Sequence, residues 1–440
     1  MPSSASQFIL HDWDYSDAES RATFRYSTDQ GHRFEESLCF RGAPQSFNES
    51  QKAALSAVLD QLHIALGISY FKAFNPPQVI RQSRPFTQDE KQFFEKLYRL
   101  GLAEYAYRNQ VSLDDLEFVG NGPSQSTIPH QLSPGIVVPI GGGKDSLLTV
   151  DLVQKSNQPF SVFSVGNHGM LHGMAEFLSL PYINVRRTIS PLLLELNQQG
   201  ALNGHVPISA LIVFILAASA VIYDFDTAIV SHEASSNSEN LIVDGRSINH
   251  QYSKSLEFEL DFQAYLKTFL PEFKYFSLLR PLGELQILER FSKLSHYHTQ
   301  FSSCNGNFKI TKAASVKWCC DCPKCRFTFL GLAAFMSPSE LLNIFGSNIL
   351  DDPAQTTGFN ELIGWTEHKP FECVGTYEES LCAFVMLTEN SDWKNCYQVK
   401  RFAQDILPSL EDVEGLRSKA LQTMGKASIP DSFEALLYAA

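Results

Sequence analysis

The chain lacks the surplus of positive charge that a protein needs to bind nucleic acid over a broad surface. Its 440 residues include 35 Lys and Arg against 48 Asp and Glu, which gives a formal net charge of −13. An acidic balance of this size argues against broad contact with a polyanion, while local basic pockets stay compatible with it. We therefore expect no nucleic-acid partner.

The sequence also lacks the features of a secreted or membrane-spanning protein. It starts MPSSASQFILHDWDY, without a basic segment followed by an apolar one, so no secretory signal is expected. Its longest apolar run, residues 206–223, approaches the ~20 residues that cross a bilayer. No Lys or Arg flanks this run, and Asp224 and Asp226 follow it at once. We expect a buried helix, a cytoplasmic location and no membrane partner.

Length and pattern predict an α/β protein with three domains, because 440 residues exceed what one hydrophobic core usually serves. Residues 1–125 are expected to form an N-terminal α+β domain, in which short alternating strands precede two helices. A segment rich in Ser, Pro and Gln, residues 123–135, is predicted to be a linker. Residues 133–335 then alternate apolar strands with helices, which predicts a parallel sheet covered by helices. Residues 336–440 are expected to be mostly helical.

The elements behind this division follow from local patterns. The antiparallel strands are expected within residues 6–41, and the two helices at 50–66 and 87–109. Apolar runs of strand length mark the parallel sheet, and they lie at residues 136–140, 160–165, 182–187, 227–231 and 275–279.

A glycine loop between an apolar strand and a helix is the strongest functional signal. The loop is Gly141-Gly142-Gly143-Lys144-Asp145-Ser146. Glycines let backbone amides turn toward a ligand, and the N-terminus of the next helix adds free N–H groups and a positive dipole end. Ser146 can hydrogen-bond a phosphate oxygen, and Asp145 can hold Mg²⁺ or order the loop. The spacing differs from a Walker A loop. A ligand-free turn is the alternative.

Polar residues follow other predicted strands, at the sheet edge where open α/β sheets bind ligands. Gly166, Asn167 and His168 follow the second parallel strand, and His232 follows the fourth. For His232, a structural role at the edge is as consistent with the pattern as a role in the site. Arg186 and Arg187 end the third strand, where they are either ligand contacts or ordinary solvated charges.

Thiols concentrate near residue 320. Cysteines with the spacing C-x14-C-x2-C-x2-C can aim four thiolates at one centre, and they are Cys304, Cys319, Cys322 and Cys325. Cys320 is left over. Structural zinc is the expected occupant, while an iron–sulfur cluster and a metal-free group of core cysteines remain alternatives.

The glycine loop resembles the Ser-Gly-Gly-x-Asp-Ser signature of the pyrophosphatase-loop ATP enzymes, with Gly141 where that family usually has Ser. The resemblance implies a HUP-like α/β domain that cleaves ATP between its α- and β-phosphates. It also implies adenine and ribose contacts near Gly166 and Asn167. The cysteine spacing is similar to the zinc knuckle of deazaguanine synthases, which carry it behind the same loop.

Several longer strings resemble MurL, the family of UDP-N-acetylmuramoyl-L-alanyl-L-glutamate epimerases. They are NGHVPIS (203–209), SHEASSNS (231–238), NHQYSKS (249–255), WCCDCPKC (318–325) and KPFECVG (369–375). The resemblance spans roughly residues 60–400. It implies epimerisation of the terminal L-Glu of a UDP-muramoyl dipeptide in cell-wall synthesis. ATP and Mg²⁺ would activate the carboxylate as an adenylate, with release of AMP and pyrophosphate.

The residues expected to carry the chemistry divide by role. Asp145 and Ser146 are assigned to activation, and Cys373 and His232 to proton transfer. His205 and His250 are further imidazole candidates, and Lys254 is a candidate contact for substrate carboxylates. Two alternatives remain: a tRNA- or nucleobase-modifying ligase or sulfur transferase that uses the same adenylation, and a non-catalytic nucleotide-binding protein. The acidic charge argues against the first and the intact Lys-Asp-Ser against the second.

Overall fold

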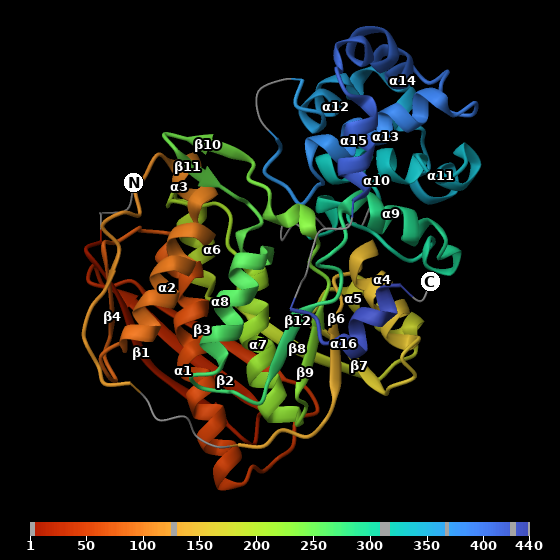
Figure 1. Ribbon diagram of the computed structural model, residues 1–440. Coiled ribbons are helices and arrows are strands. Elements are labelled where there is room, and N and C mark those ends of the chain that lie inside the picture. The colour runs from red at the N-terminus through yellow and green to blue at the C-terminus, as the bar shows by residue number, and fades with distance from the viewer. Residues whose placement is uncertain (1–4, 125–129, 309–316, 366–368, 423–427, 439–440) are drawn as a thin grey trace. The chain divides into compact units, whose positions relative to one another are not determined.

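The computed structural model describes residues 5–124, 130–308, 317–365, 369–422 and 428–438 (Figure 1). The chain divides into two compact units, and each unit is built from three separate segments of the sequence. The first, here called the sheet unit, comprises Met1–Pro139, Pro159–Ile229 and Ile248–Phe276. The second, here called the helical unit, comprises Ile140–Gln158, Val230–Ser247 and Ser277–Ala440.

One ten-stranded sheet forms the frame of the sheet unit, in the order β12-β9-β6-β7-β8-β3-β2-β1-β4-β5. The strands are β1 (Gln7–Ser16), β2 (Arg21–Thr28), β3 (Arg33–Phe40), β4 (Gln78–Arg81), β5 (Glu117–Phe118), β6 (Ile136–Pro139), β7 (Phe160–Val165), β8 (Tyr182–Thr188), β9 (Thr227–Val230) and β12 (Lys274–Ser277). Strands β9, β6, β7 and β8 run parallel, as do β1, β4 and β5. The α/β class is therefore confirmed, as are the parallel strands predicted at residues 136–140, 160–165, 182–187 and 227–231. The strand predicted at 275–279 is present as β12, beside β9.

The strands predicted for the N-terminal domain share this sheet. Strand β3 pairs antiparallel with β8, with Ser37 opposite Thr188 and Phe40 opposite Val185. Strands β1, β2 and β3 then continue the sheet by antiparallel pairing. Most of the linker predicted at residues 123–135 lies outside the described residues or is irregular chain.

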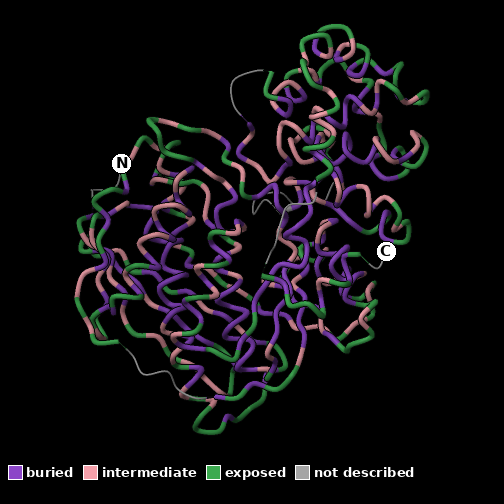
Figure 2. The backbone as a smooth tube through the Cα atoms, in the orientation of Figure 1, coloured by how far each residue is buried: buried purple, intermediate pink, exposed green. Residues whose placement is uncertain are grey.

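The helices of the sheet unit include two long apolar ones. They are α1 (Glu49–Phe71), α2 (Gln88–Gly101), α3 (Ala103–Asn109), α5 (Gly169–Leu178), α6 (Pro191–Gln198), α7 (Ile208–Tyr223) and α8 (Leu256–Leu266). Helix α1 packs against α7 and contacts β1 and β2. Figure 2 shows how much of this part of the chain is buried.

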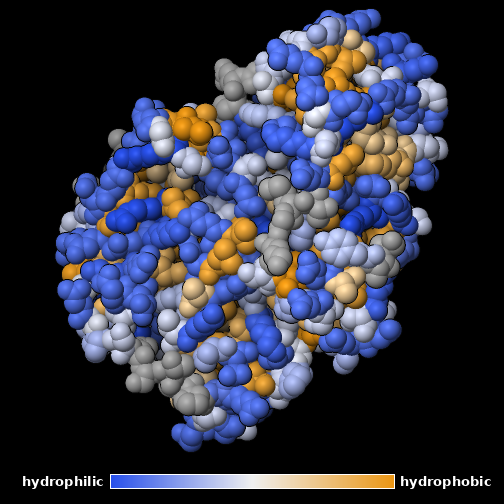
Figure 3. Space-filling model, in the orientation of Figure 1, coloured by the Kyte–Doolittle hydropathy of each residue, from blue (hydrophilic) through white to orange (hydrophobic). Residues whose placement is uncertain are grey.

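Within the described residues, α1 is the single helix long and apolar enough to cross a membrane. Its most apolar stretch is 83% buried inside the protein, which is the pattern of a core helix. Helix α7, the predicted apolar run, is buried along most of its length, from Ala210 to Ile222. The prediction that this run is a buried helix is confirmed. On the face shown in Figure 3, hydrophilic residues predominate and hydrophobic residues lie in several separate groups.

The helical unit holds the rest of the regular structure. Its helices are α4 (Lys144–Gln154), α9 (Glu284–Ser292), α10 (Pro323–Ala333), α11 (Pro338–Phe345), α12 (Thr356–Leu362), α13 (Tyr377–Glu389), α14 (Tyr397–Arg401), α15 (Val413–Leu421) and α16 (Asp431–Glu434), and its hairpin is β10 (Leu241–Val243) with β11 (Arg246–Ile248). Helix α9 packs on α4 and α10, and α10 packs on α13. The predicted helical C-terminal region is confirmed.

Buried ion pairs stabilise the sheet unit. Arg187, a candidate ligand contact from the sequence, instead binds Glu36 with Nε 2.6 Å from Oε1, so it joins β8 to β3. Glu90 accepts a 2.7 Å bond from Arg81 Nη2 and a second one from Arg84, and it also closes the capping box of α2 with Thr87. Burial raises the pKa of the Glu90 carboxyl, but the Arg84 and Arg81 bonds outweigh it and lower the pKa to about 2.

We expect Glu90→Gln to lower the free energy of unfolding by about 3 kcal/mol at pH 7, because it leaves Arg81 buried without its counter-charge. A carboxyl group whose pKa is lower in the folded protein than in the unfolded chain stabilises the folded state. This stabilisation is complete above the unfolded-state pKa and is lost as the pH falls through the folded-state pKa. The difference in free energy of unfolding between wild type and Glu90→Gln should therefore decrease as the pH falls from about 4.5 to about 2. Urea denaturation at several pH values measures it. Glu95→Gln, which removes a 3.5 Å pair with Arg99, is the matched control and should change little.

Candidate functional site

The glycine loop lies between β6 and α4, as predicted. A Cβ added at Gly141 would meet nothing within 4 Å, so the backbone there is open. Gly142 has a φ of +79°, a left-handed conformation that favours glycine. Gly143 is the N-cap of α4 and provides no side-chain cap, so first-turn N–H groups stay available to an anion. Ser146 Oγ donates to the Gly143 carbonyl at 3.1 Å.

Lys144 is buried and points into the helical unit. Its Nζ lies 2.6 Å from Asp145 Oδ1 and also pairs with Glu284, the first residue of α9. Burial lowers the pKa of Lys144, but the two carboxylates outweigh it, so the pKa is raised and the ammonium stays charged. Lys144 belongs to the loop that the sequence predicts to bind the nucleotide, and in this structure its ion pairs anchor the start of α4 to α9.

A second buried lysine lies in the same unit and was missed as a site residue. Lys369 is 2% exposed, and its Nζ has no hydrogen-bond partner among the described residues. Burial lowers its pKa, while Glu379, Glu233, Glu284 and Cys373 act in the opposite direction. The residue stands in the string KPFECVG, but no local pattern distinguishes a buried lysine from a solvated one. Cys373 is thus electrostatically coupled to this group of charges.

His232 is half-buried and lies two residues after the end of β9. Its backbone N–H donates to Ser277 Oγ at 2.7 Å, and its carbonyl accepts from the same hydroxyl at 2.6 Å. The neighbouring Glu233 carbonyl accepts a 2.9 Å bond from buried Arg280. These bonds fix the backbone of His232 at the end of the strand, as the sequence predicted, without assigning a role to the imidazole.

The four cysteines converge. Their sulfur atoms lie within 4.8 Å of one another, and they belong to Cys304, Cys319, Cys322 and Cys325. Cys320 Sγ is directed instead to the Phe345 carbonyl, at 3.4 Å. Thiol hydrogen bonds from Cys322 and Cys325 lower the pKa of Cys304. The set has the ligand number and chemistry of a structural zinc site.

The cysteine segment also supports the glycine loop. Ser302 N–H donates to the Gly142 carbonyl at 2.9 Å, two residues before Cys304. A Cβ on Gly143 would approach Ser303 Oγ to 3.0 Å, so this segment packs closely against the loop. The Ser302 hydroxyl in turn donates to the Lys317 carbonyl at 2.6 Å. A bound metal would therefore stabilise the segment on which the loop rests.

The other predicted nucleotide contacts lie in the sheet unit. Gly166 follows β7, the parallel neighbour of β6, and has a φ of +105°. Asn167 Oδ1 accepts a 3.2 Å bond from Arg41, and His168 caps α5. They stand at the carboxyl end of a strand, as expected.

Two histidines named as imidazole candidates come together in the sheet unit. The rings of His205 and His250 lie 4.1 Å apart, and His250 Nδ1 contacts a carboxylate oxygen of Glu104. Burial, followed by the neighbouring His250, lowers the pKa of His205 to about 3. Sequence reasoning missed Glu104, because it lies far from both histidines along the chain.

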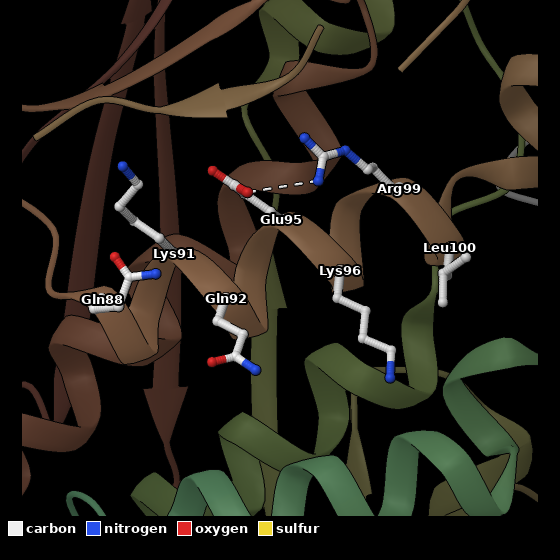
Figure 4. A pocket seen from close by; sticks show the side chains of 7 residues that line it. All are labelled: Gln88, Lys91, Gln92, Glu95, Lys96, Arg99 and Leu100. Atoms are coloured by element: carbon white, nitrogen blue, oxygen red, sulfur yellow. Dashed lines mark hydrogen bonds and ion pairs between the residues drawn. The ribbon is translucent and has the colours of Figure 1, made fainter. Parts of the chain in front are cut away.

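A surface hollow of about 580 Å³ along α2 is not a site of this kind. All its lining residues come from α2, and Figure 4 shows them directed outward along one helix, with Glu95 paired to Arg99. Nothing converges there on a common centre.

Comparison with known proteins agrees with the strings in the sequence. The model of the MurL N-terminal domain matches residues 1–278, and that of the MurL C-terminal domain matches residues 300–415. A UDP-N-acetyl-alpha-D-muramoyl-L-alanyl-L-glutamate epimerase of Xanthomonas oryzae pv. oryzae is 38% identical over 89% of this chain and 87% of its own. One of Micromonospora is 35% identical over 94% of each chain. The chain belongs to the MurL family of epimerases.

Proposed function

We propose that this epimerase converts the terminal L-Glu of UDP-N-acetylmuramoyl-L-Ala-L-Glu to D-Glu, in the cytoplasm, for peptidoglycan synthesis. The observation that carries the proposal is the match to relatives that bear this epimerase name over 89–94% of the chain. The same matches argue against the alternative of a tRNA- or nucleobase-modifying ligase. ATP is the proposed co-substrate, and the glycine loop of a pyrophosphatase-loop domain is its proposed site.

Activation by ATP answers a chemical difficulty. The Cα–H beside a free carboxylate is a very weak acid, because its loss places a second negative charge next to the first. Transfer of AMP to the carboxylate, with release of pyrophosphate, removes that charge and makes the carbonyl a better electron sink. Each pKa unit gained is worth about 1.36 kcal/mol. A base then takes the proton, an acid returns one to the opposite face, and water releases AMP.

The loop fits the phosphates of ATP. Gly141 leaves the backbone open, Gly142 uses a conformation that favours glycine, and the uncapped start of α4 offers N–H groups. Ser146 supplies a hydroxyl, and Asp145 a carboxylate of the kind that Mg²⁺ prefers. With Lys144 held by Asp145 and Glu284, backbone N–H groups and Ser146 are the proposed phosphate contacts.

Proton transfer is assigned to other groups. Cys373 and His232 remain the proposed acid and base, since both are half-buried and both belong to strings that resemble the MurL family. Cys373 is electrostatically coupled to Lys369, and a cation near a thiol favours the thiolate. His232 has a backbone fixed by Ser277, which suits a positioned imidazole.

Wild-type protein with ATP, Mg²⁺ and the L-Glu substrate should form AMP and pyrophosphate, and Ser146→Ala or Asp145→Ala should lower this rate by about 100-fold or more. Chromatography of the nucleotides measures it. Asp151→Asn is the matched control: this residue lies farther along α4, pairs with Lys155, and its replacement should leave the rate near wild type. Formation of ADP and orthophosphate by the wild type would refute the proposal.

We further propose that zinc binds the four cysteines and holds the segment under the loop. Cys322→Ser should lose one equivalent of zinc by elemental analysis and weaken nucleotide binding, because Ser302 contacts Gly142. Cys320→Ser is the matched control and should keep both properties. Iron with sulfide in anaerobically purified protein, or an unchanged zinc content in Cys322→Ser, would contradict this assignment.

If adenylation acidifies the Cα–H, its exchange with deuterated water must depend on ATP. The glutamate proton should persist without nucleotide and be lost when ATP and Mg²⁺ are added, as followed by NMR. Cys373→Ala and His232→Ala should still form AMP and pyrophosphate but return mostly L-Glu product. Rapid exchange without ATP would show that the enzyme deprotonates the free acid, and the adenylate mechanism would be wrong.

A further inference from the structure

Three metal-ligating side chains meet inside the sheet unit, apart from the glycine loop and the cysteines. They come from separate segments: Glu104 from α3, His205 from the chain before α7, and His250 from the chain after β11. One ligand atom of each lies within 4.8 Å of the others. One carboxylate and two imidazoles that converge in this way are a set of potential ligands for one metal ion.

Polar contacts hold the segment that carries His205. Asn109, at the end of α3, donates to the Asn203 carbonyl at 2.9 Å, and Asn203 Oδ1 accepts the Gly204 N–H at 2.9 Å. A Cβ on Gly204 would touch Tyr105 at 3.4 Å, so the backbone lies directly on α3. The Tyr105 hydroxyl donates to the Lys72 carbonyl at 2.6 Å. His205 therefore belongs to a segment whose backbone is held against α3 by hydrogen bonds and close packing.

Glu104 is held equally firmly. Its side chain is 6% exposed, and Arg108 Nε lies 2.6 Å from its Oε1. Its second oxygen contacts His250 Nδ1. A carboxylate oxygen and an imidazole nitrogen approach each other this closely only when a proton or a metal ion lies between them. Arg108 thus acts as the outer partner that orients a ligating carboxylate, a usual feature of metal sites.

We propose that Glu104, His205 and His250 bind one divalent metal ion of the zinc type. Two imidazoles and one carboxylate are the ligand set of catalytic zinc centres, which leave a fourth position open for water or an oxygen of another ligand. Binding displaces the proton between Glu104 and His250, so metal uptake releases protons. This proposal does not depend on the route by which ATP is used.

The rival interpretation is a metal-free proton relay, in which Glu104 orients His250 by a hydrogen bond. Both interpretations predict loss of epimerisation when a histidine is replaced, so activity alone cannot separate them. Metal stoichiometry and spectroscopy can.

The test uses tag-free full-length protein, stripped of metal and titrated with Co²⁺. A cobalt ion bound by cysteines gives an intense thiolate-to-cobalt charge-transfer band, whereas one bound by nitrogen and oxygen gives only weaker visible bands. Wild-type protein should bind one equivalent of Co²⁺ whose absorption spectrum lacks the thiolate-to-cobalt charge-transfer band. His205→Gln and His250→Gln should lose this equivalent and keep any thiolate-bound cobalt. His296→Gln, an exposed histidine of the helical unit, is the matched control and should lose neither.

A further variant separates ligation from folding. Arg108→Gln leaves all three ligands in place and should weaken cobalt binding by about 10- to 100-fold while the saturated stoichiometry stays unchanged. Circular dichroism and thermal melting verify the fold of each variant. Absence of the non-thiolate equivalent in wild type, or its persistence in both histidine variants, overturns the proposal. Impaired epimerisation in the histidine variants with that absence would identify the proton relay instead.

Discussion

A buried lysine that stays charged needs a counter-charge, and the arrangement of the helical unit depends on how Lys144 meets that requirement. Its ammonium pairs with Asp145 and Glu284, so the first turns of α4 and α9 are fixed to each other. The Glu284 N–H donates to Ser235 Oγ at 3.0 Å, and the Ser235 hydroxyl donates to a Glu379 carboxylate oxygen at 2.9 Å. Glu379 in turn forms the capping box of α13 with Thr376. Removing one partner of such a network leaves an uncompensated charge, which costs more than the pair itself contributes.

This network explains how a loop of small residues keeps a defined shape. Glycines stabilise no conformation by themselves, and their freedom is costly to restrict. Here the ion pairs of Lys144 hold the end of the loop, and the hydrogen bond from the Ser302 N–H to the Gly142 carbonyl holds its middle. The backbone N–H groups at the start of α4 are therefore oriented before any ligand arrives, which lowers the entropic cost of binding.

Local patterns predicted the features that depend on local physics. Apolar runs located β6, β7 and β9, glycine chemistry located the loop at Gly141, and thiol spacing located the cysteine cluster. Features that depend on distant partners were not predictable. The pairing of β3 with β8, the ion pair of Arg187 with Glu36, and the approach of Glu104 to His250 join segments far apart in sequence. No short segment of the sequence contains both partners, so the pairings and the burial of the paired residues had to come from the structure.

The interleaved course of the chain has a consequence for synthesis. Helix α4 belongs to the helical unit, but most of that unit starts only at Ser277. On the ribosome, at about 5–20 residues per second, α4 emerges well before Glu284 and waits while the intervening strands are made. During this interval Glu284 has not yet been synthesised, so Asp145 is the single one of the two carboxylates that is present to pair with Lys144. The glycine loop thus acquires its contacts with Glu284 and Ser302 late, after all strands of the ten-stranded sheet have been synthesised.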